Sequence, residues 1–213
     1  MRGGWVAAAR HTDGTVSWRV VERFATLVEG REHGCVVAVD IPIGLPESQP
    51  RRCDKEARRL LPGRASSVFP APTRATAADR REDVTYAEAV RRARGRGHAA
   101  PSRQTWFITD KINDVADACQ DLPPALRVRE CHPEVSFATL SGSVLPRKAT
   151  AAGVGRRITA FTGWVDAAAG LGDVPDGIPV VDALDALACL WTAERVATGR
   201  ATRIGDETAS IWV

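Results

Sequence analysis

The feature that most constrains the fold is an unbroken apolar run, Cys35–Val39, that ends at Asp40 and continues into Ile-Pro-Ile-Gly-Leu-Pro. A run of this kind, rich in β-branched residues, indicates a strand that is covered on both faces, as in a parallel sheet. The ends of such strands open into the crevices where α/β proteins bind ligands. Asp40 is therefore a candidate active-site residue, although an aspartate before Pro and Gly also commonly caps its own loop.

The segments around this strand predict an α/β order of elements. Residues 5–10 and 16–21 predict a hairpin with an Asp13-Gly14 turn, and residues 22–31 predict a helix that leads into the strand at Cys35. Further helices are expected over 49–61, 85–96, 110–122 and 181–198, a short strand over 126–128, and loops over 63–73, 95–102 and 170–179.

Length and composition fit one conventional globular domain. The chain has 213 residues, of which 44% are hydrophobic and 26% charged. No apolar stretch approaches the ~20 residues of a membrane span, and the N-terminus does not resemble a secretory signal. We therefore expect no membrane partner and a cytoplasmic location. The five cysteines show no metal-ligand spacing, so we interpret them as reduced thiols.

Arginines cluster within residues 51–64 and again within residues 91–96, in a chain whose formal net charge is +3. Such clusters suit contacts with phosphate groups, and they are equally typical of a solvated surface. The sequence thus leaves nucleic acid as a possible partner.

Two acidic residues open the last predicted helix. Asp182 and Asp185 are three residues apart, so they share one face of its first turn. Two like charges side by side favour a cation between them. Alternatively, Asp182 is an N-cap or first-turn acid that the helix dipole favours, and Asp185 is only its exposed neighbour. The apolar residues of this helix that can face the core are Leu184, Leu187, Ala188 and Trp191.

Glu130 follows the predicted strand over 126–128 and precedes His132-Pro133-Glu134. It could hold a divalent metal or orient a water, and His132 could then move a proton. His132 and Glu134 could instead form a structural turn, since a lone histidine is a poor magnesium ligand. Lys148 could neutralise a phosphate, but a basic residue in a loop commonly contacts only water.

Six blocks of residues occur in an order that resembles one family. They are Ala38–Pro46, Arg52–Arg58, Ser66–Arg74, Gln104–Ile112, Glu130–Phe137 and Asp182–Ala188. The chain resembles the domain of unknown function 429 family, regarded as predicted nucleases with an RNase H-like fold related to RuvC-type resolvases. The likeness spans almost the whole chain, and Ser66–Pro72 and His132–Phe137 are its most specific blocks.

The resemblance implies one RNase H-like α/β domain over residues 1–213, a mixed sheet flanked by helices with a helical and loop insertion at about 47–122. In this layout carboxylates bind two Mg²⁺ or Mn²⁺ ions, which activate a water and stabilise the leaving oxygen at a phosphodiester. Asp40, Asp182 and Asp185 would be the metal ligands, and Glu130 a further catalytic residue. The expected substrate contacts are Arg52, Arg58, Arg74, Lys111, His132 and Lys148.

The chain departs from the family pattern at its start. The family usually opens with a strand that ends in Gly-Val-Asp-Gly just before Arg-Gly-Gly-Trp, which is Arg2–Trp5 here, so the first strand and its aspartate are missing. We expect a misassigned start rather than a natural loss, because a sheet without its central strand exposes unpaired edges.

Two hypotheses of function follow. The first is a metal-dependent nuclease that acts on DNA or RNA. The second is a catalytically impaired protein that keeps the fold and binds nucleic acid or another partner, because one metal ligand is missing. A small-molecule phosphotransferase ranks last, since the sequence shows no glycine-rich phosphate loop.

Overall fold

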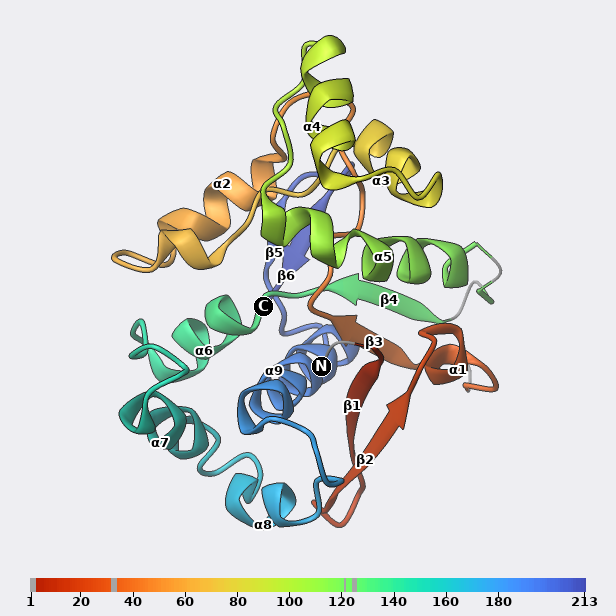
Figure 1. The fold of residues 1–213 in the computed structure, drawn as a ribbon. Coiled ribbons are helices and arrows are strands. Elements are labelled where there is room, and N and C mark those ends of the chain that lie inside the picture. Colours follow the sequence, from red (N-terminus) through yellow and green to blue (C-terminus); the bar gives the residue numbers. More distant parts are fainter. Residues whose placement is uncertain (1–2, 32–33, 121, 124–125) are drawn as a thin grey trace.

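The computed structural model describes residues 3–31, 34–120, 122–123 and 126–213. Strands and helices are mixed along the chain, so the protein is of the α/β class, as predicted (Figure 1). In chain order the elements are β1 (Trp5–Arg10), β2 (Val16–Val21), α1 (Ala25–Val28), β3 (Val36–Val39), α2 (Arg52–Arg59), a 3₁₀ turn η1 (Ala65–Ser67), α3 (Arg74–Arg81), α4 (Tyr86–Gly95), α5 (Arg103–Ala118), β4 (Arg127–Glu130), α6 (Pro133–Ser141), α7 (Ala151–Ala160), α8 (Ala167–Gly172), α9 (Val180–Ala197), β5 (Arg203–Gly205) and β6 (Ser210–Trp212).

The first two strands form the predicted antiparallel hairpin, in a register that pairs Trp5 with Val21. Its turn follows from the residues found there. Gly14 has a φ of 88°, which only glycine adopts freely. The Asp13 carboxylate accepts hydrogen bonds from both the backbone N and the hydroxyl of Thr15. The turn chemistry read from the sequence is confirmed.

The buried strand β3 pairs in parallel with β4, and Val39 lies opposite Glu130 at their C-terminal ends. β5 and β6 form an antiparallel pair, which touches the end of β4 through one bridge between Cys131 and Trp212. Among the described residues the strands form three two-stranded sheets, and β1 does not pair with β3. The single mixed sheet that the resemblance implies is therefore not confirmed among these residues.

Two apolar clusters hold the strands and helices together. One joins α1 and α5 to β1, β3 and β4, and it includes Phe24, Ile112 and Val39. The other joins α9 to α2, α6, α7 and the C-terminal hairpin, and it includes Leu184 and Phe137. α9 also packs against both β1 and β3. β1 and β3 consequently lie between α9 on one side and α1 with α5 on the other (Figure 1).

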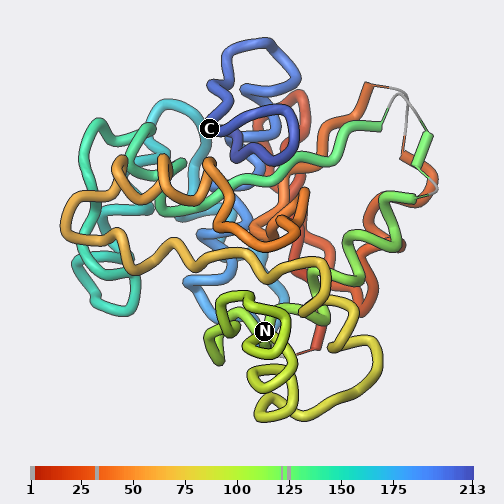
Figure 2. Tube along the Cα trace, turned by 90° about the horizontal axis from the view of Figure 1, so that it is seen from above, coloured from red at the N-terminus to blue at the C-terminus, as the bar shows by residue number. Residues whose placement is uncertain are grey.

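The segment over residues 47–122 consists mainly of helices. In Figure 2, α3 and α4 (yellow to yellow-green) form a lobe that extends from the body of the molecule. α5 ends this segment, but Ile112 and Val115 are buried in the cluster with α1. The part that extends away from the strands is therefore α3 with α4, since α2 packs against β5 and β6.

The arginine-rich helix α4 is held to α3 by ion pairs. The Asp79 side chain is 1% exposed and accepts hydrogen bonds from Arg96 at 2.6 and 2.8 Å and from Arg92 at 3.1 Å. Arg92 also contacts Glu82 and Glu88. The second arginine cluster of the sequence thus fastens two helices together, and much of its charge is neutralised within the lobe.

Several elements differ from their predictions because of local signals at the helix ends. The helix predicted over 22–31 is the single turn α1, and the one predicted from residue 110 begins at Arg103, where the Ser102 hydroxyl accepts from Thr105 N. α6 lies where a turn was expected, since Pro133 occupies its first turn, a position that needs no N–H donor. β4 extends through Glu130, which therefore lies in the strand rather than after it. The helix predicted over 181–198 is confirmed as α9.

The Asp79 network generates a prediction about stability and pH. Side-chain hydrogen bonds from Arg96 lower the pKa of Asp79 below its ordinary value of 3.8, so its stabilising effect is present above that pH and is lost as the pH falls through the folded-state pKa. We expect Asp79→Asn to lower the free energy of unfolding by about 2 kcal/mol at neutral pH.

Urea denaturation at several pH values measures this. The gap between wild type and Asp79→Asn should narrow below about pH 3.8. The matched control is Asp110→Asn. The Asp110 side chain pairs with Arg80 but is 58% exposed, so we expect this substitution to change the free energy of unfolding by less than about 0.5 kcal/mol. A difference in the free energy of unfolding that is equally large at all pH values would contradict the lowered pKa of Asp79.

Candidate functional site

A cleft of about 590 Å³ lies between β1, β3 and α9. Every residue of β1 and of β3 lines it, and so does one face of α9. Each of these strands pairs with a neighbour on one side only, so their other backbone edges are unpaired within the described residues. The cleft is therefore walled by two strands and one helix.

Three of the predicted metal ligands line this one cleft. Asp40 directly follows β3, and Asp182 and Asp185 lie in the first two turns of α9. The N-cap of α9 is Pro179, without a side-chain cap, so Asp182 is a first-turn acid and not the N-cap. Two lysines line the same cleft, Lys111 from α5 and Lys148 from the loop before α7. The structure thus brings together carboxylates that are more than a hundred residues apart in the sequence.

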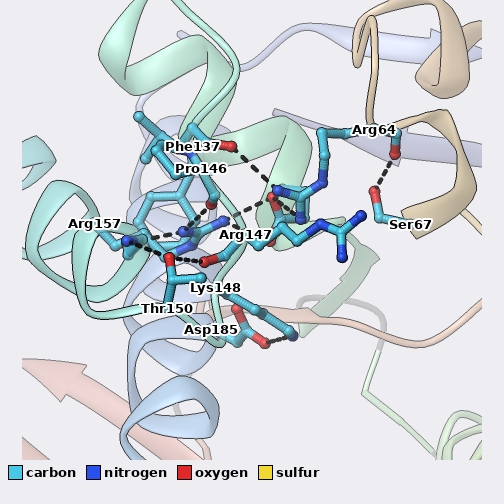
Figure 3. A network of polar contacts seen from close by, with 12 residues as sticks. Arg64, Ser67, Phe137, Pro146, Arg147, Lys148, Thr150, Arg157 and Asp185 are labelled. Atoms are coloured by element: carbon cyan, nitrogen blue, oxygen red, sulfur yellow. Dashed lines mark hydrogen bonds and ion pairs between the residues drawn. The ribbon is translucent and has the colours of Figure 1, made fainter.

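Asp185 is the most strongly perturbed of these acids. Lys148 Nζ lies 2.6 Å from its Oδ2, as Figure 3 shows, and its side chain is 15% exposed. Burial raises the pKa of Asp185 to about 6, and the negative charges of Asp40 and Glu134 add to this effect, while Lys148 opposes it. The other oxygen, Oδ1, is buried and has no hydrogen-bond partner in the part of the chain that the structure describes. One lone-pair face of this carboxylate is therefore available to a ligand.

Asp40 lies in the same electrostatic environment. Its side chain is open to the solvent of the cleft, although protein atoms surround it closely. This enclosure raises the pKa of Asp40, and His132 and Lys148 oppose the rise. A cation near Asp40 and Asp185 would relieve their mutual repulsion.

Lys111 is fixed at the other side of the acids. Its Nζ donates to the Gly4 carbonyl at 2.6 Å and lies 4.6 Å from the centroid of the Trp5 ring. Burial lowers the pKa of Lys111, and the charge of Asp182 opposes this shift. Lys111 therefore holds the start of β1 against the site.

Glu130 is in a different place from the other predicted catalytic residues. Its Oε1 and Oε2 accept from Arg51 Nη2 and Nη1, each at 2.7 Å, and Oε2 also accepts from Ile43 N at 2.6 Å. Arg51 also binds Asp54. The three charged side chains are at most 5% exposed, and Glu130 does not line the cleft. This geometry favours a structural role, in which Glu130 fixes the loop after β3 and the start of α2.

His132 and Glu134 begin α6 beside the site. His132 Nε2 contacts the Ser67 carbonyl at 3.2 Å, and its Nδ1 is buried without a partner among the described residues. Glu134 receives both of its hydrogen bonds from Arg157 Nη2, at 2.7 and 2.8 Å. Glu134 is thus structural, while the unpartnered Nδ1 of His132 is buried and His132 does not line the cleft.

The predicted substrate contacts divide into two groups. Lys111 and Lys148 line the cleft, and His132 acts electrostatically on Asp40. The arginines are engaged elsewhere and do not line the cleft: Arg52 pairs with Glu56, Arg58 donates to the Val68 carbonyl, and Arg74 contacts Leu45 and Glu47.

The opposite end of the cleft was not predicted from the sequence. Arg10 of β1 pairs with Glu194 of α9 at 3.4 Å, and both line the cleft. Cys189 also lines it, between this pair and Asp185. This face of α9 could have been predicted from the sequence, because residues 182, 185, 189 and 193 recur at helical spacing on a side of the helix different from its apolar face.

The fold and the cleft define an α/β protein with carboxylates at the end of a parallel strand and at the start of a packed helix. The chain belongs to the family described as "Protein of unknown function (DUF429)", which matches residues 1–210. The expected membership is confirmed. No curated protein and no solved structure matches the chain.

Two negative findings apply to the residues that the structure describes. No group of three or more His, Cys, Asp and Glu side chains there is arranged to hold a metal ion. None of the helices in the same residues combines the length and the apolar character that crossing a bilayer requires.

The Arg51 network generates a second prediction, which compares two adjacent arginines. Arg51→Met leaves Glu130 and Asp54 buried without their cation, and we expect it to lower the free energy of unfolding by about 3–5 kcal/mol. Arg52→Met removes only an exposed i,i+4 pair with Glu56, and we expect a change within about 0.5 kcal/mol. Chemical denaturation of both variants measures the difference. Equal stability of the two variants would show that Glu130 is not held as described and would return it to the catalytic candidates.

Proposed function

We propose that the protein is a metal-dependent nuclease of RNase H-like type that hydrolyses phosphodiester bonds in DNA or RNA. One observation carries the proposal: Asp40, Asp182 and Asp185 line one cleft together with two lysines. Burial raises the pKa of both Asp40 and Asp185, and the charge of Asp40 adds to the rise at Asp185. Carboxylates perturbed in this way are typical of functional sites.

The donor set suits Mg²⁺ or Mn²⁺. These ions prefer oxygen ligands, and Mg²⁺ is commonly held by only one or two carboxylates, with waters and substrate phosphates completing its shell. The unpartnered Oδ1 of Asp185 and the accessible carboxylate of Asp40 would hold the ion, with Asp182 in the same cleft. A bound divalent ion lowers the pKa of a water and stabilises charge on phosphate oxygens.

The remaining side chains would prepare the site for a phosphodiester. Lys148 neutralises one oxygen of Asp185, and Lys111 places a second positive charge at the cleft. Either ammonium group could bind a phosphate oxygen once the acids hold a cation. His132 acts electrostatically on Asp40 from beside the cleft.

The order of elements supports an RNase H-like layout, with a hairpin, a helix and a parallel strand ending in an acid, and later a last helix that carries the acid pair. The unpaired edges of β1 and β3 face one cleft, which is where a further strand lies in such a sheet. The free thiols agree with a cytoplasmic location, which we also propose.

The alternative function is a binding module that keeps the fold without catalysis. It is favoured by one finding, that no ready group of three metal-binding side chains occurs in the described residues. In that case binding to nucleic acid should persist unchanged in the aspartate variants and should not depend on a metal.

Cleavage of branched, single-stranded and RNA–DNA hybrid substrates with Mg²⁺ or Mn²⁺ tests the first function. We expect Asp40→Asn and Asp185→Asn each to lower the cleavage rate by at least about 100-fold, because each removes a proposed metal ligand. Asp176→Asn, an exposed acid near the start of the same helix, is the matched control and should cleave as wild type does. Activity that survives both substitutions, or that EDTA does not abolish, would contradict the metal site.

The layout has its own test, independent of cleavage. An engineered N-terminal strand that ends in Gly-Val-Asp-Gly before Arg2 should turn at Gly3-Gly4, enter the cleft antiparallel to β1 and bond to β3 in parallel. We expect a higher melting temperature, because the two strand edges gain partners.

The same extension with Asn in place of its Asp is the control. It should show the same gain in melting temperature and weaker Mn²⁺ binding. An extension that stays accessible to protease and leaves the melting temperature unchanged would reject the RNase H-like layout.

A further inference from the structure

Two cysteines from different elements meet beside the cleft. Cys131 directly follows β4 and Cys189 lies on α9, and their Sγ atoms are 3.3 Å apart although the residues are 58 positions apart in the sequence. All five cysteines are free thiols in this structure. A disulfide bond is about 2.05 Å long, so these two sulfur atoms need to approach by roughly 1.3 Å to form one.

The two thiols differ in access. Cys189 lines the cleft and is partly exposed, whereas Cys131 is 1% exposed. A small oxidant that enters the cleft therefore meets Cys189 first. The neighbouring Cys189 thiol and burial together hold the pKa of Cys131 well above its usual range, so Cys131 stays protonated until a reactive sulfur lies beside it.

We propose that Cys131 and Cys189 form a redox-modification site, at which hydrogen peroxide entering the cleft converts the two thiols into a disulfide. In the first step the Cys189 sulfur attacks one peroxide oxygen, the O–O bond breaks, and Cys189 becomes a sulfenic acid while one water leaves. In the second step the Cys131 sulfur attacks the Cys189 sulfur, the S–O bond breaks, and the second water leaves with the Cys131 proton. The peroxide takes up the two electrons that the thiols lose.

The bond would fasten α9 to the end of β4. Cys189 is one helical turn beyond Asp185, and Cys131 is adjacent to Glu130 in the sequence and bridges to Trp212. Oxidation therefore ties together the helix and the strand pair that form two walls of the cleft. This modification does not depend on the proposed nuclease activity and goes beyond it.

A cysteine in the same cleft provides a matched control. Cys35 also lines the cleft and is partly exposed, but among the described residues its sulfur contacts only the Val36 carbonyl, at 4.0 Å, and no second thiol. An accessible thiol without a partner should form no cross-link and should remain open to alkylation.

The experiment treats the full chain with hydrogen peroxide, unfolds it, alkylates the remaining thiols and maps the peptides by mass. We expect three of the five cysteines to be alkylated, one cross-linked peptide pair that contains Cys131 and Cys189, and reversal by dithiothreitol. Cys189→Ser and Cys131→Ser should abolish the cross-link, and Cys35→Ser should retain it. If the Cys131→Ser variant does not fold, the Cys189→Ser variant still tests the proposal, because Cys189 is partly exposed and its cross-link should likewise be lost.

Thermal denaturation provides a second readout. A bond that closes a long loop restricts the unfolded chain, so oxidation should raise the melting temperature by about 5 °C in wild type and in Cys35→Ser, and not in Cys189→Ser. Oxidation of Cys189 to a sulfinic acid without any cross-link, or a cross-link to another cysteine, would overturn the proposal.

Discussion

The arrangement of the molecule depends on α9, because one helix has to pack against two strand pairs and against the helical layer behind it. Its apolar residues at 184, 187, 188 and 191 are buried in the core cluster with α6 and α2. Residues 182, 185, 189 and 193 lie on another face and line the cleft. Since a helix turns about 100° per residue, these two sets need different sides, and both sides are used. The acid pair reaches the cleft because the core fixes the rotation of the helix.

The carboxylates around the cleft differ in how deeply they are buried and in which basic residue they contact. Glu130 and Glu134 are each held by an arginine that is at most 3% exposed, Arg51 and Arg157, so these acids are neutralised within the fold. Buried carboxylates with two guanidinium hydrogen bonds contribute to a unique arrangement rather than to chemistry. Asp185 differs, because its lysine contacts only one of its two oxygens. The buried carboxylate oxygen at the cleft that lacks a partner among the described residues is therefore Oδ1 of Asp185.

The sequence predicted the parts of this structure that local patterns determine. The hairpin, the buried strand that ends at Asp40, and the last helix with its apolar face were all evident from period and turn chemistry. The partners of individual charges were not, since an arginine paired across 79 residues, as Arg51 is with Glu130, looks the same in sequence as an exposed one. Helices α3 and α6 were missed because their signals are the N-cap Thr73 and the first-turn proline Pro133 rather than apolar periodicity. The pairing of strands, which sets the cleft, is a long-range property that no single segment carries.

The balance of charge at the cleft also limits how it can bind a metal. Three carboxylates face two ammonium groups, so the site carries little net negative charge before any ion arrives. Lys148 already neutralises part of the negative charge of Asp185. A divalent ion alone would therefore leave an excess of positive charge in a partly enclosed space. A phosphodiester brings the negative charge that offsets this excess, and its oxygens are ligands that Mg²⁺ prefers. Under the proposed nuclease function, metal and phosphate binding at these acids and lysines would therefore be coupled, and each ligand should bind more tightly when the other is present.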